Sequence, residues 1–328
     1  MKHVLVIRLS ALGDVAILAP VLKARAEANP EVIFTVAAPP MLEPLFEGLP
    51  NVHFLGLKKK QSSWKIFEAL KGVGADTVAD LHVVNRVGRA LTLLRIDALL
   101  HFNFRFKVFR LRKGRISRMV MLRHWNMAPR RPQWQRYDDV FGRLFGDGSC
   151  KTPPIIHHPL PSKRIGIAPF SQHEGKVWPW ANIEQLVKML AAKGYNVLLF
   201  GSKEEAPQLE ALAASVTGAE SVAGRLTFRE ELDTIKGLSL MVSMDSANMH
   251  FASAVGTPVV SIWGATHPDF GFYGYGQERE NALCANLPCQ PCSAYGQKAC
   301  RYGDYHCLKA ITPEMVINRI STLIANQI

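Results

Sequence analysis

The chain repeats one pattern, in which a short apolar run is followed by a longer segment with regularly spaced polar positions. Short apolar runs between turn signals predict buried strands, and the longer segments predict helices. Strands that alternate with helices through short connections form a parallel sheet with helices on both faces. In the first half the predicted strands are residues 2–8, 32–37, 52–57 and 77–81, and the predicted helices are 15–28, 42–47, 64–71, 87–94 and 135–145.

A stretch rich in glycine and proline, residues 146–161, separates two rounds of this pattern. We therefore expect two α/β domains, 1–158 and 159–328, with a cleft between them and a terminal helix able to pack back on the first domain. In open α/β sheets, ligands bind at the carboxyl ends of the strands, where Asp14 and Asp245 are expected. In the second half the predicted strands are residues 164–168, 196–200, 238–243 and 258–263, and the predicted helices are 181–192, 204–215, 228–236 and 313–325.

The net charge of +12 points to an anionic partner, such as a nucleic acid, a nucleotide or a membrane surface. Lys2 and the apolar run after it resemble the start of a signal peptide, but Arg8 and Asp14 interrupt that run and no clean cleavage site follows. No uncharged apolar stretch reaches the ~20 residues of a membrane span. We therefore expect a cytoplasmic protein, with peripheral contact to the inner face of a membrane as a further option.

Residues 98–137 interrupt the strand–helix pattern with eleven Arg or Lys residues and no Asp or Glu. The simplest interpretation is a loop or short-helix excursion that presents a positive surface. Single-stranded RNA, an anionic lipid or a phosphorylated glycan would each suit this composition, and so would a solvated basic face without a partner. The interleaved aromatic residues are Phe102, Phe104, Phe106, Phe109, Trp125 and Trp134.

Five of the six cysteines lie between residues 284 and 307, and the sixth is Cys150. A chain without a secretion signal is not expected to use them as a disulfide scaffold. The spacing of Cys289 and Cys292 is typical of half a zinc site, but Cys300 and Cys307 do not form a second closely spaced pair. We expect no metal, and a structural zinc site is the alternative.

Residues 243–250 combine several features of an anion site. Asp245 or Ser246 follows an apolar run and can serve as the N-cap of a short helix. The N–H groups and positive dipole end of a helix suit a phosphate or diphosphate, and the small side chains of Ser246 and Ala247 let a ligand approach. His250 lies one helical turn later, so it can face the same crevice. The alternatives are an ordinary capped turn with a surface histidine and, for His250 itself, a partly buried helix histidine without a ligand.

Several segments, in the same order and over essentially the whole chain, resemble the heptosyltransferase family of glycosyltransferases, glycosyltransferase family 9. Any one of these segments is a weak signal, and their order is the stronger one. The segments are Arg8-Leu9-Ser10-Ala11-Leu12-Gly13-Asp14 with Pro20, Gly175-Lys176-Val177-Trp178-Pro179, Gly201-Ser202-Lys203-Glu204-Glu205, Ala223-Gly224-Arg225-Leu226-Thr227 followed by Asp245-Ser246-Ala247-x-x-His250, and Ala254-x-Gly256-Thr257-Pro258-Val259-Val260 through Gly264-Ala265-Thr266-His267-Pro268.

The resemblance implies an α/β fold of the GT-B type, with two facing Rossmann-like domains that have parallel sheets and an interdomain cleft. It implies an inverting, metal-independent transferase without a cofactor, which moves heptose from ADP-heptose to an anionic acceptor of the lipopolysaccharide core at the inner membrane surface. We expect a monomer and no nucleic-acid partner. A non-catalytic polyanion- or RNA-binding protein on the same fold is the alternative. A dinucleotide oxidoreductase is disfavoured because residues 8–14 lack Gly-x-Gly-x-x-Gly.

The family motifs assign roles to residues of both domains. Asp14 is the expected general base, which takes the proton of the attacking sugar hydroxyl, although an aspartate there also suits a helix N-cap. Gly13 leaves room for the acceptor. Lys176 is the cation expected to neutralise the departing nucleoside diphosphate, which makes Asp14 and Lys176 the expected catalytic pair.

The remaining expected contacts divide between donor and acceptor. The N–H groups of Ser246, Ala247 and Asn248 would hold the diphosphate. Ala247 departs from the common family motif, which has glycine there, and alanine does not readily adopt a positive φ. The other expected donor-binding residues are Ser10, Gly13, Leu226, Thr227, Asp245 and His250, and the expected acceptor-binding residues are Lys60, Arg86 and Arg123.

Overall fold

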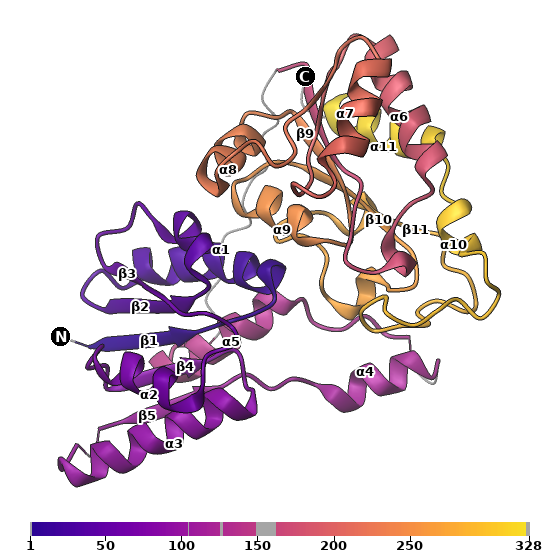
Figure 1. Cartoon of the computed structure of the whole chain (residues 1–328). Coiled ribbons are helices and arrows are strands. Elements are labelled where there is room, and N and C mark those ends of the chain that lie inside the picture. Colours follow the sequence, from indigo (N-terminus) through magenta and orange to yellow (C-terminus); the bar gives the residue numbers. More distant parts are fainter. Residues whose placement is uncertain (1, 104, 125–126, 149–161, 326–328) are drawn as a thin grey trace. The chain divides into compact units, whose positions relative to one another are not determined.

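The computed structural model of the chain describes residues 2–103, 105–124, 127–148 and 162–325. It contains two compact units, each built on one parallel sheet (Figure 1). The predicted boundary between residues 158 and 159 lies outside the described residues, as do Phe104, Trp125 and Cys150. Unit 1 comprises Met1–Gly114 and Gln133–Pro153, and unit 2 comprises Arg115–Pro132 and Pro154–Ile328.

The sheet of unit 1 confirms the predicted parallel arrangement. Its strand order is β3-β2-β1-β4-β5, and each neighbouring pair is parallel. The order reverses between β1 and β4, which makes that gap the switch point where ligands bind in open α/β sheets. The strands are β1 (His3–Ile7), β2 (Ile33–Ala38), β3 (Val52–Gly56), β4 (Thr77–Asp80) and β5 (Lys107–Arg110).

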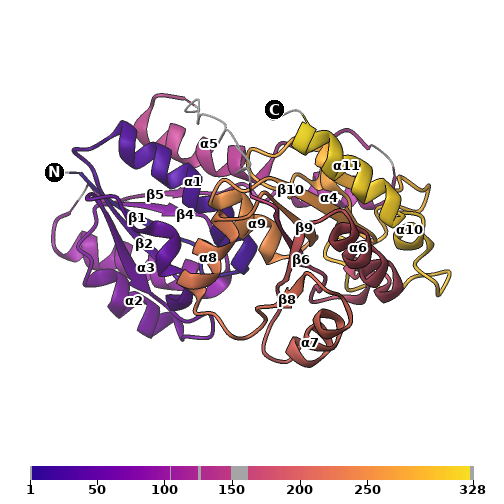
Figure 2. The ribbon, with the colours of Figure 1, turned by 90° about the horizontal axis from the view of Figure 1, so that it is seen from above.

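Helices cover both faces of this sheet. Helices α1 and α5 contact each other on one side of the strands, and α2 and α3 contact each other on the other side (Figure 2). The buried side chains between α2, α3 and the strands include Leu5, Val78 and Leu91. The bounds are α1 (Leu12–Ala28), the 3-10 helix η1 (Pro40–Phe46), α2 (Ser63–Lys71), α3 (Asn85–Leu100) and α5 (Gln133–Phe145).

A buried ion pair joins α1 to α5. Arg25 is 1% exposed, and its Nε donates to Asp138 Oδ1 at 2.8 Å. Its Nη1 donates to Asp147 Oδ2, also at 2.8 Å. Because burial disfavours the charged form, the pKa of Asp138 is raised, although the bond from Arg25 opposes this shift. The guanidinium therefore keeps a buried carboxylate compensated at the helix contact.

The sheet of unit 2 has the same topology with one more strand. Its order is β11-β10-β9-β6-β7-β8, again with parallel neighbours, and the switch point lies between β6 and β9. The strands are β6 (Arg164–Ala168), β7 (Asn196–Leu199), β8 (Ala219–Ser221), β9 (Leu240–Met244), β10 (Val259–Trp263) and β11 (Ala282–Cys284).

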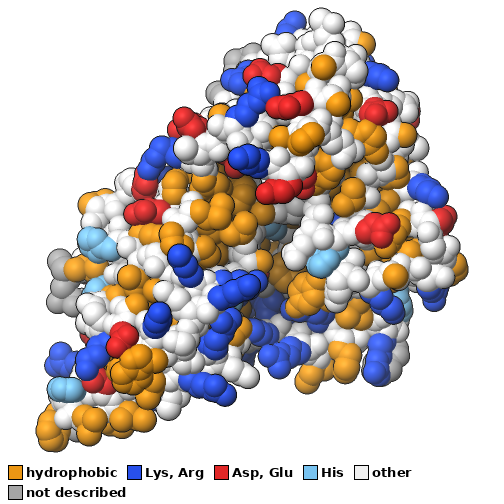
Figure 3. All heavy atoms as spheres, viewed as in Figure 1, with side chains coloured by type: hydrophobic (Ala, Val, Ile, Leu, Met, Phe, Trp, Pro, Cys, Tyr) orange, Lys and Arg blue, Asp and Glu red, His pale blue; other side chains and the backbone are white. Residues whose placement is uncertain are grey.

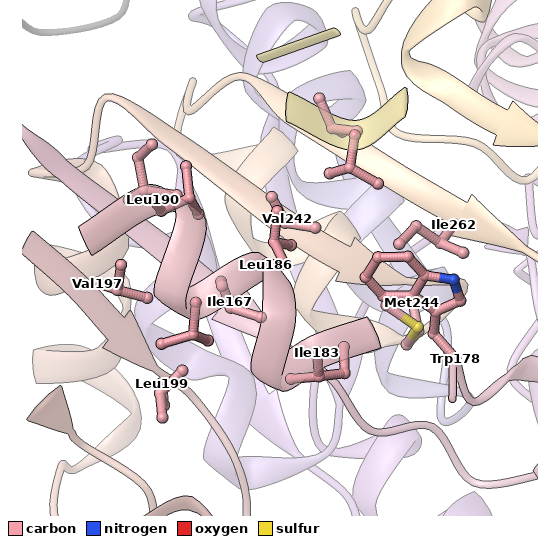
Figure 4. Packing of buried hydrophobic residues seen from close by; sticks show 14 of the residues in the cluster. Ile167, Trp178, Ile183, Leu186, Leu190, Val197, Leu199, Val242, Met244 and Ile262 are labelled. Carbon is pink, nitrogen blue, oxygen red and sulfur yellow. The ribbon is translucent and has the colours of Figure 1, made fainter. Parts of the chain in front are cut away.

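The core of unit 2 forms where α6 packs on this sheet. Side chains of α6, such as Leu186, lie against strand residues such as Ile167 and Val242 (Figure 4). Trp178 is buried beside them and donates from Nε1 to the carbonyl of Ile311 at 2.9 Å. The bounds are α4 (Arg115–Leu122), η2 (Glu174–Lys176), α6 (Trp180–Ala192), α7 (Ala206–Ser215), α8 (Phe228–Lys236), α9 (Ala247–Ala254), η3 (Pro268–Phe270), η4 (Arg279–Asn281), α10 (His306–Lys309) and α11 (Pro313–Ala325).

The structure adds three strands at sheet edges that the sequence pattern did not predict. β5 lies inside the basic stretch, where a loop or short-helix excursion was expected, and β8 and β11 have three residues each. β5 is basic and half-exposed, and β8 and β11 are too short for an apolar run, so none of the three carries the signal that marks a buried strand. The terminal helix α11, which could have packed on the first domain, contacts α6 and β10 in unit 2.

Part of the basic stretch belongs to the second unit. Residues 115–132, with α4, group with unit 2, so the expectation that the whole stretch lies in the first domain is wrong for this part. The backbone N–H of Arg130 donates to the carbonyl of Asp269 at 2.9 Å, and the guanidinium of Arg118 lies over the rings of Phe272 and Tyr295. Among the helices of the described residues, none is long and apolar enough to cross a bilayer.

Replacing Arg25 by methionine should destabilise unit 1 by about 3–5 kcal/mol, because a buried carboxylate would lose its partner. The double variant Arg25→Met, Asp138→Leu removes both charges and should recover most of that loss. Urea denaturation, followed by circular dichroism, measures the free energy of unfolding of the single and the double variant. A double variant as unstable as the single one would show that the loss comes from packing and not from the uncompensated charge.

Candidate functional site

In unit 1, Asp14 lies beside the switch point, in the first turn of α1. Its Oδ2 forms an ion pair with Arg8 Nη2 and accepts from the backbone N–H of Ala11 at 3.3 Å. Its Oδ1 lies 3.4 Å from the hydroxyl of Tyr137 on α5. The helix begins at Leu12, with Ala11 as its N-cap, so Asp14 is not the N-cap. The carboxylate is thus held through Oδ2, while Oδ1 has only a long contact among the described residues.

Arg8 holds the ends of the two central strands together. It follows β1, and its Nη1 donates to the carbonyl of Leu81, just after β4, at 2.6 Å. The residue is 8% exposed, and its guanidinium lies 5.8 Å from the ring centroid of Tyr137. The side chain of Asp14 is 20% exposed, so the carboxylate stays reachable from solvent while its partner is buried.

His82 is a further group at this edge, and sequence reasoning missed it. The residue is 7% exposed, and its Nδ1 has no hydrogen-bond partner among the described residues. Burial and the positive charges of Arg8 and Lys113 lower its pKa to about 4, so the ring is neutral at pH 7. The signal in the sequence is the run Asp80-Leu81-His82 at the end of a predicted strand, where Asp80 Oδ1 accepts from the N–H groups of His82 and Val83.

The expected acceptor residues lie in both units. Lys60 and Arg86 are exposed in unit 1, and Arg86 Nη1 lies 3.5 Å from the carbonyl of Gln61. Arg123 is exposed in the segment after α4, which groups with unit 2. Ser10, in the turn between β1 and α1, and Gly13, in the first turn of α1, are both partly buried.

In unit 2, Lys176 and Asp245 meet across the other switch point. Lys176 ends η2, after β6, and its Nζ lies 2.8 Å from Asp245 Oδ2, just after β9. Thr266, which follows β10, donates to the same oxygen at 2.8 Å. The side chains of Lys176 and Asp245 are 15% and 10% exposed. The predicted cation is therefore fixed in place by a partly buried carboxylate.

Helix α9 begins beside this pair. Ser246 is its N-cap with an extended backbone, and Ala247 and Asn248 are its first residues. The N–H groups of a first helical turn have no partner inside the helix, so they are available to an anion. Ala247 has a helical backbone, so the position needs no positive φ and alanine is compatible with it.

Glu231 on α8 is a second group that the sequence reasoning missed. The amide of Asn248 lies 3.4 Å from its Oε1, and burial raises the pKa of this carboxyl. The rings of Phe228 and Phe251 pack edge to face at 4.9 Å and hold α8 against α9. No spacing in the sequence relates Glu231 to residues 245–250, so only the helix contact reveals it.

The other expected donor residues lie around these two helices. Leu226 is partly buried, and Thr227 is the N-cap of α8, where its backbone N–H donates to Glu230 at 2.7 Å. His250 is 7% exposed, so it is a buried histidine of α9, as in the alternative of a buried helix histidine, and not a surface histidine.

The cysteine-rich segment supports the Lys176 loop by packing. Cys292 and Ser293 donate from their backbone N–H groups to the carbonyl of Ala265, whose own N–H donates to Gly175. A Cβ atom at Gly296, where φ is +85°, would lie 2.6 Å from Cγ of Lys176, so only glycine lets this segment pass so close.

The thiols of this segment are free in the described residues. No group of three or more His, Cys, Asp or Glu in that part of the chain is arranged to hold a metal ion. Burial, with the neighbouring Cys292 and Cys289, raises the pKa of Cys307 to about 12, which keeps it protonated. The cysteine-rich segment therefore supports the Lys176 loop through its backbone hydrogen bonds and its close packing.

A family model described as glycosyltransferase family 9 (heptosyltransferase) matches residues 123–305, more than half of the chain. Lipooligosaccharide heptosyltransferase 2 of Haemophilus influenzae is 29% identical over 168 residues, which are 49% of this chain and 47% of that relative. The chain therefore spans about half the length of this curated relative.

Solved structures match over nearly the whole length. The glycosyltransferase family 9 structure from Veillonella parvula has a TM-score of 0.75 and 20% identity, and covers 99% of this chain and 98% of its own. An Escherichia coli heptosyltransferase with ADP-2-deoxy-2-fluoro heptose has a TM-score of 0.69 and 17% identity, and covers 98% and 99%. These likenesses confirm the predicted GT-B fold with two parallel-sheet α/β domains, whereas the cleft between the domains stays a prediction.

Because the pKa of His82 falls to about 4 in the folded chain, folding should weaken as pH drops. An unfolded histidine takes a proton near pH 6.5, so stability present at pH 7 is lost between about pH 6.5 and 4, by about 3 kcal/mol. His82→Gln should flatten this part of the pH dependence. Urea denaturation of both proteins at pH 7 and 4 measures it, and equal losses would refute the role of His82.

Proposed function

The chain belongs to glycosyltransferase family 9, the heptosyltransferases, and we propose that it transfers heptose from ADP-heptose to an acceptor of the lipopolysaccharide-core type. The observation that carries the proposal is the pair of polar clusters, one at the switch point of each sheet. Asp14 is the reactive group of unit 1, and Lys176 is the cation of unit 2. The Escherichia coli structure with a fluorinated ADP-heptose supports the choice of donor.

In the proposed reaction, Asp14 acts as the general base. Its Oδ1 takes the proton of an acceptor hydroxyl, while the ion pair with Arg8 keeps Oδ2 in place. The hydroxyl oxygen forms a bond to the anomeric carbon from the face opposite the diphosphate, and the bond from that carbon to the diphosphate oxygen breaks. ADP leaves with the bonding electrons, so the configuration at the anomeric carbon inverts.

The departing diphosphate needs positive charge as its bond breaks. Lys176 supplies a cation that Asp245 holds in a fixed position, and the start of α9 supplies N–H groups from Ala247 and Asn248. These groups exist before the donor binds, so little reorganisation is needed during the reaction. The proposed mechanism therefore neutralises the leaving group with protein groups and without a metal.

We assign the remaining donor contacts to residues on or next to α8 and α9. Leu226 and Thr227 precede α8, and we assign them to the base or the ribose. Glu231 and Asn248 present a carboxylate and an amide, which suit hydroxyl groups. Oδ2 of Asp245 already binds Lys176 and Thr266. Asp245 can therefore accept from a sugar hydroxyl only through the lone pairs that these two contacts leave available. His250 is the least accessible of the expected contacts.

The acceptor is assigned to the basic side chains. Lys60 and Arg86 of unit 1 and Arg123 of unit 2 offer cations to the phosphates and carboxylates of an inner-core glycolipid. We propose a monomer that works in the cytoplasm at the inner membrane surface. The alternative, a non-catalytic RNA-binding protein, would bind generic RNA with a steep dependence on salt and ignore nucleotide sugars.

Asp14→Asn should lower kcat by roughly 10²–10⁴-fold, because the amide cannot accept the proton. Donor affinity should stay close to that of the wild type, since most of the expected donor contacts lie in unit 2, which the variant leaves unchanged. Transfer assays with ADP-heptose and calorimetric titration with ADP measure the two effects. Glu27→Gln, an exposed change on the same helix, is the matched control. Undiminished turnover of Asp14→Asn would disprove its role as the base.

Lys176→Gln should lower kcat by roughly 10²–10³-fold, the cost typical for loss of one group that stabilises the transition state. Lys176→Arg keeps the charge and should retain part of the activity. The exposed Lys193→Gln serves as the control for charge alone. If Lys176→Gln is folded by circular dichroism and turns over like the control, the leaving-group role belongs to another residue.

A further inference from the structure

Unit 1 exposes a group of large apolar side chains where α3 ends. Ile96 is 49% exposed, Leu99 60% and Leu100 71%, and Phe102 just after the helix is 80% exposed. Figure 3 shows hydrophobic side chains gathered over this end of α3, with Lys, Arg and His side chains and some Asp or Glu beside them. Single exposed apolar residues are common, but four neighbours in seven positions mark an interaction surface.

The same side of unit 1 carries basic residues and an exposed tryptophan. Trp64 of α2 is 57% exposed, and Lys65, Arg89 and Arg95 are exposed on α2 and α3. Helices α2 and α3 together contain five Lys or Arg against two Asp or Glu. Of these acids, Asp97 is already paired with Lys71 at 2.6 Å, and Glu68 accepts from the indole of Trp64. The surface therefore carries a net positive charge.

Helices α2 and α3 lie side by side and run in the same direction, since each returns from one parallel strand to the start of the next. Arg86 Nη1 lies near the Gln61 carbonyl at one end, and Lys71 pairs with Asp97 towards the other. The exposed positions 89, 92, 96 and 99 repeat every three or four residues, so they form one stripe along α3. That stripe is basic near the Asp14 edge of the sheet and apolar at the far end.

From this arrangement we propose that the outer side of α2 and α3 is a docking face for the surface of an anionic lipid bilayer. We define the docking face by Trp64, Lys65, Arg89, Arg95, Ile96, Leu99, Leu100 and Phe102. Leucine, phenylalanine and tryptophan insert among lipid headgroups, and arginine and lysine pair with anionic lipids. The charge of this face matches such lipids and disfavours a basic copy of the same chain.

An acceptor that is carried by a lipid would lie at the bilayer surface, next to the docking face. The inference rests on the proposed function in one respect, namely that a core-type acceptor is carried by a lipid. With α3 lying along the surface, its first residues bring the Asp14 edge towards the headgroups. The helix has 16 residues, so the apolar anchor lies up to ~24 Å from that edge and leaves the edge itself open to the acceptor.

Vesicle flotation tests the docking face on the full chain without any substrate. Vesicles of phosphatidylcholine with about one third phosphatidylglycerol should carry the wild type upwards, and ~0.5 M salt should weaken binding. Leu99→Glu, Leu100→Glu should reduce binding at least about tenfold, because two apolar anchors become anions. Arg89→Gln, Arg95→Gln should reduce it roughly fivefold per charge removed.

The matched control is Met41→Glu, Met315→Glu, since both methionines are exposed, at 52% and 43%, outside the docking face. If this control binds as weakly as Leu99→Glu, Leu100→Glu, or if all variants bind like the wild type, the docking face is refuted. Light scattering, which measures the molar mass in solution, tests whether a second copy of the chain covers this face instead. If the wild type is a dimer that does not bind vesicles, and Leu99→Glu, Leu100→Glu makes it a monomer, the docking face binds a second copy and not a bilayer.

Transfer assays separate this inference from the proposed function. Leu99→Glu, Leu100→Glu should match the wild type on a deacylated, water-soluble acceptor and be slower on the same acceptor embedded in vesicles. Equal rates on embedded acceptor would refute the docking face and leave the transferase intact. Vesicle binding that depends on Leu99 and Leu100, without transfer to either acceptor, would refute the proposed function and support the docking face.

Discussion

In each unit, a largely buried cation ties together the ends of the two strands that flank the switch point. Arg8 after β1 binds the carbonyl of Leu81 after β4, and Lys176 after β6 binds Asp245 after β9. The two contacts occupy the same place in the shared topology. A buried cation without a partner would be costly, so the partner fixes each loop in one conformation. The position of the candidate site depends on these contacts.

The two contacts leave different groups accessible. In unit 1 the arginine is buried and the Asp14 carboxylate is partly exposed, which suits a base that meets a hydroxyl. In unit 2 the carboxylate of Asp245 is also bound by Thr266, and Lys176 lies beside the start of α9. That arrangement suits a lysine ammonium group that is held in a fixed position to bind an anion. The same topology thus carries opposite charges at the two positions that we propose as the base and the cation of a glycosyl transfer.

The sequence predicted the strands that contain an apolar run, and most of these strands are buried. Central strands such as β1 and β9 are buried on both faces, so their apolar runs identified them. The edge strand β5 is basic and half-exposed, and its pairing with β4 is a long-range contact without a local signal. The family motifs predicted Asp14 and Lys176, and each motif follows the first strand of its sheet. His82 and Glu231 needed the packed structure, since their environment comes from distant segments.

By itself the sequence determined the two rounds of strand and helix, the family motifs and the positive charge, because these depend on local periodicity and composition. Tertiary structure decided which charges are paired. It joined Arg8 to Asp14 and Lys176 to Asp245, placed residues 115–132 with unit 2, and left Ile96, Leu99 and Leu100 uncovered. The physical reason is that burial and pairing are properties of neighbours in space, and chain order does not specify those neighbours.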